Sequence, residues 1–88
     1  MARLIQVLLV EDHLILQRCT KSLLENRGRE VTVVGTKEAA LNAVQSRIFD
    51  LLLIDIGLPD GSGWEVIECC RESSDSRNPL TPIVMVSA

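Results

Sequence analysis

The amino-acid sequence alternates short apolar runs with longer amphipathic stretches. The clearest apolar run covers residues 51–55, where four aliphatic residues lead without a polar break into Asp55. An apolar run without alternation is typical of a strand that is buried on both faces, as in a parallel sheet. Similar runs occupy residues 4–10, 31–34 and 83–86. The pattern therefore predicts four strands, with Asp55 at the carboxyl end of a central strand.

Between these runs, apolar residues recur at helical spacing, and each predicted helix has recognisable end signals. Asp12 is placed to cap a first helix, which we expect to end at Gly28. Thr36 is placed to cap a second helix. Ser62 and Glu65 match the capping-box pattern at the start of a third. The residues expected on the inner faces are Leu16, Cys19, Leu23 and Leu24 in the first helix, Ala40, Ala43, Val44 and Ile48 in the second, and Trp64, Val66, Ile67 and Cys70 in the third.

The predicted elements follow one another in the order β-α-β-α-β-α-β. Strands that alternate with helices of this length indicate parallel βαβ units with right-handed crossovers. A polar loop, residues 73–79, connects the last helix to the last strand. In open α/β sheets, ligands bind at the carboxyl ends of the strands. The functional residues of this α/β protein are therefore expected where its strands end.

Composition narrows the class of protein further. The 88 residues have room for one domain, residues 1–88, and its core must be aliphatic because the chain has one Trp, one Phe and no Tyr. A net charge of -3 provides no basic surface for nucleic acid. No apolar stretch could span a membrane and the N-terminal run lacks the features of a signal peptide, so we expect a cytoplasmic location. Cys19, Cys69 and Cys70 follow no disulfide or metal pattern and are expected to be reduced and mostly buried.

Carboxylates close two of the predicted strands. Glu11 and Asp12 follow the first strand, and Asp55 ends the third. If these strands are neighbours, about 4.8 Å apart, the three carboxylates converge. When carboxylates cluster, either their pKa values rise or a cation binds between them. A site made only of oxygen ligands suits Mg²⁺. Asp55 is then placed to act as a nucleophile, because a carboxylate can take a phosphoryl group to form an acyl phosphate.

Several polar residues near these acids can be explained by their local structure, without a role in a functional site. Asp12 alone is equally consistent with a helix cap. Asp50 and Asp60 are typical of a strand start and a turn. His13 has no cysteine or second histidine to support it and is not expected to be a ligand. Ser87 ends the fourth strand at the same edge of the sheet, where its hydroxyl could meet a phosphate.

Three stretches of the sequence together resemble one family in their order and spacing. They are Val7-Leu8-Leu9-Val10-Glu11-Asp12, the segment from Phe49 to Ile67 with Asp55-Ile56-Gly57-Leu58-Pro59 at its centre, and Pro82-Ile83-Val84-Met85-Val86-Ser87-Ala88. The family is the receiver domain of bacterial two-component response regulators. This resemblance extends over the whole chain. It implies a doubly wound parallel sheet in a three-layer αβα fold, like that of flavodoxin and CheY, with strand order 2-1-3-4 for the strands present.

The resemblance also implies a function and the residues that carry it. Asp55 would accept a phosphoryl group from a phosphohistidine on a sensor histidine kinase or a histidine phosphotransfer protein. Glu11 and Asp12 would bind Mg²⁺ or Mn²⁺, together with Asp55 and the backbone carbonyl of Gly57. Ser87 would bond to the phosphoryl oxygen as the switch hydroxyl. The domain would change conformation to regulate an output, and it is not expected to be an enzyme beyond assisting its own phosphorylation and dephosphorylation.

The chain departs from the family after its fourth strand. A receiver has five βα units, and the lysine and the aromatic switch residue that accompany the fifth strand have no counterpart here. We therefore expect a C-terminally incomplete receiver domain. The fourth strand would form a bare apolar edge, which favours a homodimer or a strand-exchanged association. An apolar face would also be left open, so the chain is expected to be only marginally stable as a monomer.

Two other functions remain open at this point. A haloacid-dehalogenase-like phosphatase also uses an aspartate at a strand end, but it needs a second acid two residues later, where this chain has Gly57. A phosphorylation-silent interaction module of the same fold is the stronger alternative, because the lysine of the family is missing from this sequence.

Overall fold

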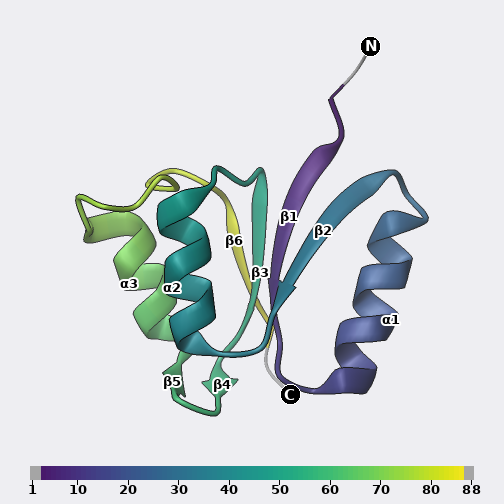
Figure 1. Ribbon diagram of the computed structural model, residues 1–88, viewed down its shortest axis with the longest axis horizontal. Helices are drawn as coiled ribbons and strands as arrows, with labels where there is room; N and C mark the ends of the chain where they lie inside the picture. The colour runs from purple at the N-terminus through teal and green to yellow at the C-terminus, as the bar shows by residue number, and fades with distance from the viewer. Residues whose placement is uncertain (1–2, 87–88) are drawn as a thin grey trace.

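A parallel sheet of four strands forms the centre of the molecule (Figure 1). The computed structural model describes residues 3–86. Its elements are β1 (Ile5–Val10), α1 (Leu14–Glu25), β2 (Arg29–Val34), α2 (Lys37–Ser46), β3 (Leu51–Asp55), β4 (Gly57–Leu58), β5 (Gly61–Ser62), α3 (Gly63–Glu72) and β6 (Ile83–Val86). The strand order in the sheet is β2-β1-β3-β6, so the predicted order and the parallel arrangement are confirmed.

The register of the central strands determines which residues meet at the edge of the sheet. Val10, the last residue of β1, lies opposite both Val34 and Ile54. Asp55 is one residue beyond Ile54 and pairs with Val86 of β6. The residues that follow β1 and the last residue of β3 therefore lie at the same end of two neighbouring strands.

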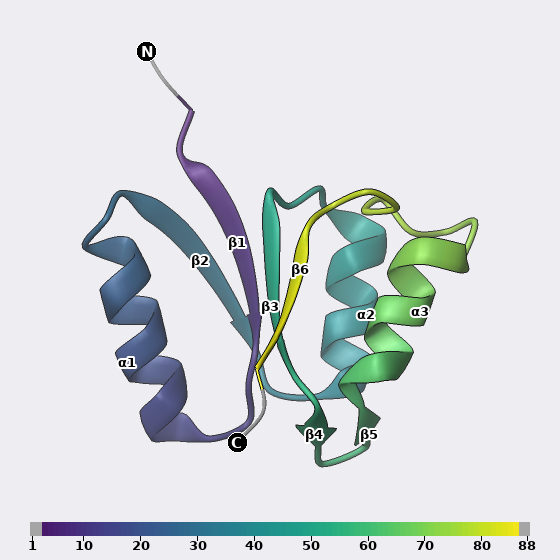
Figure 2. The same ribbon diagram turned by 180° about the vertical axis from the view of Figure 1, so that it is seen from behind.

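Alternate side chains of the strands build a core on each face of the sheet. One core contains Leu8, Val10, Leu52 and Ile54 and is covered by the paired helices α2 and α3. The other contains Val7, Leu9 and Val31 and has Leu24 of α1 packed against it. The helices therefore form outer layers on both faces of the sheet, and Figure 2 shows α1 at one end with α2 and α3 together at the other.

Helix α1 differs from its prediction in two respects. No residue of this helix is buried, and Leu23 is 60% exposed although it belongs to the expected inner stripe. The reason is that α1 packs chiefly against β2, so only one side of the apolar stripe is in contact with the sheet. The cap is His13, one residue after the predicted Asp12, and it makes no side-chain capping bond. The predicted end is confirmed, because Gly28 follows the helix with a positive φ of 77°.

The inner faces of α2 and α3 are largely as predicted. Ala40, Val44, Val66 and Cys70 are buried. Trp64 is 59% exposed, because a residue two positions before Val66 lies about 200° away from it around a helix. The remaining departures are Ile48, which is exposed beyond the end of α2, and Cys19 and Cys69, which are exposed and half-buried rather than buried like Cys70.

The polar loop before β6 contains a buried anchor that the sequence did not reveal. Asn78 is almost completely buried, and its side chain accepts a hydrogen bond from the Phe49 amide at 2.8 Å. It also donates to the carbonyl oxygens of Val44 at 2.8 Å and Arg47 at 2.7 Å. These bonds fix the loop to the start of β3 and the end of α2. Within residues 3–86, no helix is long and apolar enough to cross a membrane.

Candidate functional site

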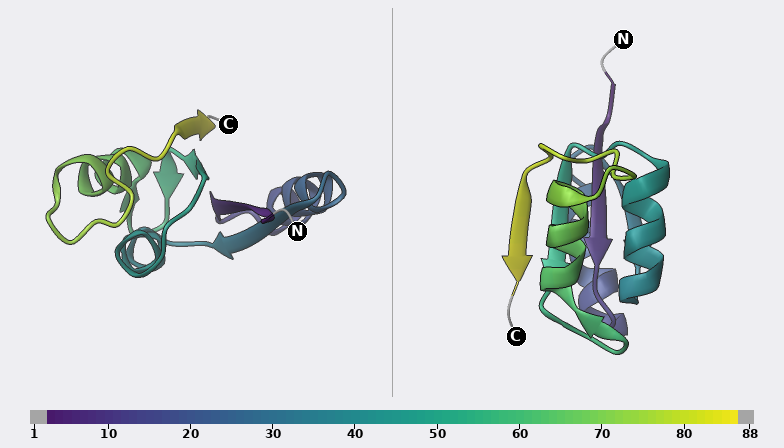
Figure 3. Two further views of the ribbon diagram at one scale, coloured as in Figure 1. Left: turned by 90° about the horizontal axis from the view of Figure 1, so that it is seen from above. Right: turned by 90° about the vertical axis from the view of Figure 1, so that its left-hand side faces the viewer.

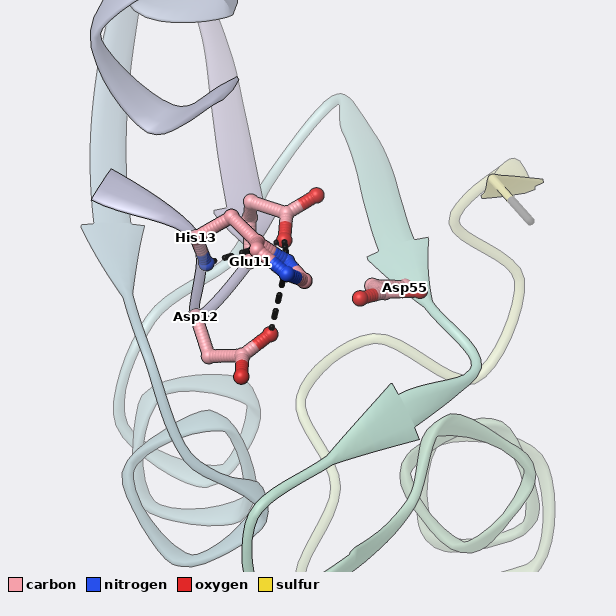
Figure 4. A group of neighbouring side chains, drawn as sticks. All are labelled: Glu11, Asp12, His13 and Asp55. Atoms are coloured by element: carbon pink, nitrogen blue, oxygen red, sulfur yellow. Dashed lines mark hydrogen bonds and ion pairs between the residues drawn. The ribbon is translucent and has the colours of Figure 1, made fainter. Parts of the chain in front are cut away.

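Three carboxylates and one imidazole meet at the carboxyl end of the sheet (Figure 4). Glu11 and Asp12 follow β1, His13 caps α1, and Asp55 ends β3. Each of the four residues offers a ligand atom, and these atoms lie within 4.8 Å of one another. The predicted convergence of the carboxylates is therefore observed, and its cause is the pairing of β1 with β3.

Backbone hydrogen bonds hold Glu11 in place at the rim. Its amide donates to the Val34 carbonyl at 3.0 Å, and its own carbonyl accepts a bond from the Gln17 side chain. The side chain is turned inward, since Glu11 is only 6% exposed, and Oε2 accepts a bond from the His13 amide at 3.1 Å. The first acid of the pair is thus positioned by β2 on one side and by α1 on the other.

Asp12 gives the clearest sign that the cluster suits a cation. Its Oδ1 atom is buried and accepts no hydrogen bond from the part of the chain that the structure describes. The nearest basic atom is Nδ1 of His13, at 3.5 Å. A buried carboxylate oxygen without a donor is unfavourable, and a bound cation removes that penalty. Asp12 is therefore free for a ligand role, because His13 and not Asp12 caps the helix.

Asp55 points into the same space from the end of β3 (Figure 4). The residue is 8% exposed, and its Oδ1 accepts one long bond, 3.4 Å, from the amide of Gly57. The helix α3 begins directly behind it, where Gly63 donates to the Ile56 carbonyl at 2.8 Å. A Cβ at position 63 would collide with the carbonyl oxygen of Asp55, so a glycine is required there.

The loop after Asp55 is tied to the start of α2 by charged side chains. Asp60 accepts bonds from the amides of Lys37 at 2.6 Å and Glu38 at 3.0 Å, and the first of these contributes most to lowering the pKa of Asp60 below its ordinary value. Lys37 pairs with Glu65 at 2.9 Å, which raises the pKa of the lysine and lowers that of the glutamate. Asp60 was expected only to shape a turn, so its contact with α2 is new. The predicted capping box of Ser62 and Glu65 is confirmed.

Gly57 and Ser87 are the other two residues that were predicted to belong to the site. Gly57 lies in the strand β4 immediately after the cluster, and its amide faces Asp55. The role expected of its carbonyl remains a prediction. Ser87 lies outside the described residues, although its neighbour Val86 pairs with Asp55. His13 was not expected to be part of a site, and the only signal for it was its place directly after two acids.

The donor set fits a hard divalent cation. Three carboxylates within reach of one point supply the oxygen ligands that Mg²⁺ prefers, and Asp12 Oδ1 is a buried oxygen that lacks a partner. Part of the cluster is accessible, because Asp12 and His13 are not fully buried. The arrangement can therefore hold a cation beside Asp55 while leaving room for a second molecule to approach.

Comparison with known proteins identifies the family. Residues 7–88 match the family described as the response regulator receiver domain. The chain is 33% identical to a CheY-like receiver domain from Methylobacillus flagellatus, with a TM-score of 0.85 over 97% of this chain and 70% of that one. The chain belongs to the response regulator receiver family, whose members are regulatory phosphoacceptor domains and not enzymes.

Two further relatives show where such domains occur. The chain is 38% identical over 84 residues to the sensor protein GacS of Pseudomonas syringae pv. syringae. The matched region covers 94% of this chain and 9% of GacS. It is 26% identical to the receiver domain of the sensor histidine kinase PA1611 from Pseudomonas aeruginosa PAO1, with a TM-score of 0.85 over 94% of this chain and 66% of that one. That structure has a magnesium ion coordinated in its active-site cleft. The chain thus spans a small part of GacS and about two thirds of the solved receivers.

Proposed function

We propose that this domain accepts a phosphoryl group on Asp55 in a Mg²⁺-dependent reaction. The donor is a phosphohistidine on a sensor histidine kinase or a histidine phosphotransfer protein, and the reaction takes place in the cytoplasm. The observation that carries the proposal is the convergence of Glu11, Asp12 and Asp55 at the carboxyl end of the sheet. The family membership and the magnesium in the PA1611 receiver support the same reaction.

The residues of the cluster have distinct tasks in this proposal. A carboxylate oxygen of Asp55 attacks phosphorus, the bond from phosphorus to the donor imidazole breaks, and the imidazole leaves. Mg²⁺ supplies stabilisation of the charge on the transferred oxygens, and Asp12, Glu11, Asp55 and the Gly57 carbonyl are the ligands we assign to it. The Gly57 amide, now 3.4 Å from Oδ1, orients the nucleophile. Ser87 is the proposed switch hydroxyl, which bonds to the phosphoryl group after transfer and relays its presence to the output.

Mass spectrometry of the intact protein tests this function directly. The protein is incubated with Mg²⁺ and a small acyl phosphate, and a phosphoryl adduct that is stable in acid and labile in base is expected. Asp55→Asn removes the adduct, whereas Asp75→Asn, at an exposed loop position, retains it. Labelling of the Asp55→Asn variant, or no labelling of folded wild-type protein, contradicts the proposal. The second result would favour the phosphorylation-silent interaction module instead.

The edge strand β6 supports a second part of the proposal, that two copies associate. Within residues 3–86, β6 pairs only with β3, and both Val84 and Val86 are about half exposed. An apolar edge of this kind favours pairing with another strand, either as a homodimer or by strand exchange. Sedimentation velocity is expected to show a dimer that grows with protein concentration and is lost in Val84→Lys. A wild-type protein that stays monomeric at high concentration contradicts this part of the proposal.

A further inference from the structure

His13 lies inside the carboxylate cluster but has no task in the proposed phosphoryl transfer. Its Nδ1 atom faces both neighbouring acids, at 3.3 Å from Oε2 of Glu11 and 3.5 Å from Oδ1 of Asp12 (Figure 4). A ligand atom of its ring also lies within 4.8 Å of one from Asp55. Mg²⁺ takes oxygen ligands, whereas imidazole nitrogen suits Zn²⁺ and other transition metals. A nitrogen at this place therefore changes the range of cations that the site can hold.

Two acids of the cluster have carboxylate groups that the protein leaves with little or no hydrogen bonding. Oδ1 of Asp12 is buried and accepts no hydrogen bond from the described residues. Asp55 is more than nine-tenths buried, and the long bond from Gly57 is the one hydrogen bond of its side chain within residues 3–86. Both side chains point toward His13 in Figure 4. One nitrogen and two poorly satisfied carboxylates thus surround a common point.

The spacing of these atoms matches a small cation with mixed ligands. Zn²⁺ binds histidine nitrogen and carboxylate oxygen at about 2.0–2.2 Å, and ligand atoms around a tetrahedral ion at such bond lengths lie about 3.4 Å apart. The separations of Nδ1 from Oε2 of Glu11 and Oδ1 of Asp12 are 3.3 and 3.5 Å. The ring nitrogen therefore already stands at tetrahedral spacing from the carboxylates of Glu11 and Asp12, and the ligand atom of Asp55 lies within 4.8 Å of all three.

We propose that His13 makes this site a binding site for a borderline transition cation, represented by Zn²⁺, in addition to Mg²⁺. Its ligands are the imidazole nitrogen and the carboxylates of Glu11, Asp12 and Asp55, whose ligand atoms all lie within 4.8 Å of one another. This inference rests on the proposed function, because the two cations share the carboxylates. Zn²⁺ and Mg²⁺ consequently compete, and Zn²⁺ at low concentration blocks the Mg²⁺-dependent phosphorylation of Asp55.

Calorimetric titration of the two cations tests the proposal. Tag-free protein is used with Cys19→Ser and Cys69→Ser, because those two thiols are at least partly accessible and could bind Zn²⁺ themselves. Zn²⁺ and Mg²⁺ are titrated separately into this protein and into the same protein with His13→Asn. The ratio of Zn²⁺ to Mg²⁺ affinity is expected to fall about tenfold or more in His13→Asn, as for other losses around metal sites. His13 is the one histidine of the chain, so its imidazole NMR signal reports directly on the ligand and is expected to shift with Zn²⁺.

The results separate this inference from the proposed function. A Zn²⁺ affinity that is the same with and without His13, or an imidazole signal that does not respond to Zn²⁺, overturns the inference. If Mg²⁺ still binds in that case, the proposed function stands. Zn²⁺ binding that depends on His13 in a protein that binds no Mg²⁺ supports the inference and contradicts the proposed function.

Discussion

The two faces of the sheet differ in how well helices cover them. On the face of α2 and α3, the side chains of Leu8, Leu52, Val44 and Val66 are completely buried, and the helices pack against each other. On the opposite face, α1 has no buried residue and packs chiefly against β2 (Figure 3). Most of the favourable apolar burial therefore lies on one side of the molecule, although strands of the same sheet supply both cores.

This difference bears on the candidate site, because the cluster draws on both sides. Asp55 comes from a strand whose following loop is tied to α2 by Asp60 and Lys37. Glu11 follows β1 and is bonded to β2, whereas Asp12 and His13 lead into the loosely packed α1. We infer that Asp55, the proposed phosphoacceptor, is held on the well-packed part of the molecule and that Asp12, a proposed metal ligand, lies where local opening costs least.

Matched leucine truncations should give the largest contrast between the two faces. Leu52→Ala removes a fully buried side chain and is expected to lower the free energy of unfolding by about 3 kcal/mol, or to unfold the protein in buffer. Leu23→Ala changes a side chain that is 60% exposed and is expected to cost less than about 1 kcal/mol. Urea denaturation followed by circular dichroism measures both. Equal losses would show that α1 is as well packed as α2 and α3.

The buried Asn78 should give the next largest effect. Asn78→Ala leaves the Phe49 amide and the Arg47 carbonyl without this partner and is expected to cost about 2 kcal/mol. The Val44 carbonyl loses one bond but still accepts from the Arg77 amide at 2.9 Å. Asn42→Ala, at an exposed position of α2, is the matched control and is expected to be neutral or slightly stabilising because alanine favours helices. The same urea experiment compares them. An Asn78→Ala variant as stable as the control would mean that the loop before β6 is not anchored by this residue.

A smaller effect is expected from Asp50, at the opposite end of the sheet from the site. The hydrogen bond from Arg3, with the Gln6 amide, lowers the pKa of Asp50 to about 2. A carboxyl whose pKa is lower in the folded protein stabilises it above the unfolded pKa, and this contribution is lost as the pH falls through the folded value. The melting-temperature advantage of wild type over Asp50→Asn should therefore be full above about pH 5 and shrink toward about pH 2. An advantage that does not change with pH would contradict this assignment.

The fold could be predicted well because its signals are local and repeated. The run that ends in Asp55 reads as a buried strand at once, and Thr36 and Ser62 both cap the helices they were expected to cap. The strand order came from the resemblance to receivers. Once β1 and β3 were taken as neighbours, the meeting of Glu11, Asp12 and Asp55 followed from geometry, without any knowledge of side-chain positions.

The structural roles that were not predicted depend on contacts between residues that lie far apart in the sequence. Asn78 lies in a polar loop and is buried only because Phe49 and α2 close over it. Asp60 looks like a turn residue until α2, more than twenty residues earlier, is placed beside it. The exposure of α1 could not be read from its apolar stripe either, because a helical pattern shows which face is apolar and not whether anything covers it.

Binding of Mg²⁺ to the carboxylate cluster is the most direct test of the central claim. Trp64 is the one tryptophan of the chain and lies in the first turn of α3, directly after Gly63, which packs closely on the Asp55 carbonyl, so its fluorescence can follow a Mg²⁺ titration. We predict saturable binding in wild type, binding weakened tenfold or more in Asp12→Asn, and wild-type binding in the loop control Asp75→Asn. Equal Mg²⁺ affinity in Asp12→Asn and Asp75→Asn would contradict the account, because the cation would then not be held by the acids at the end of the sheet.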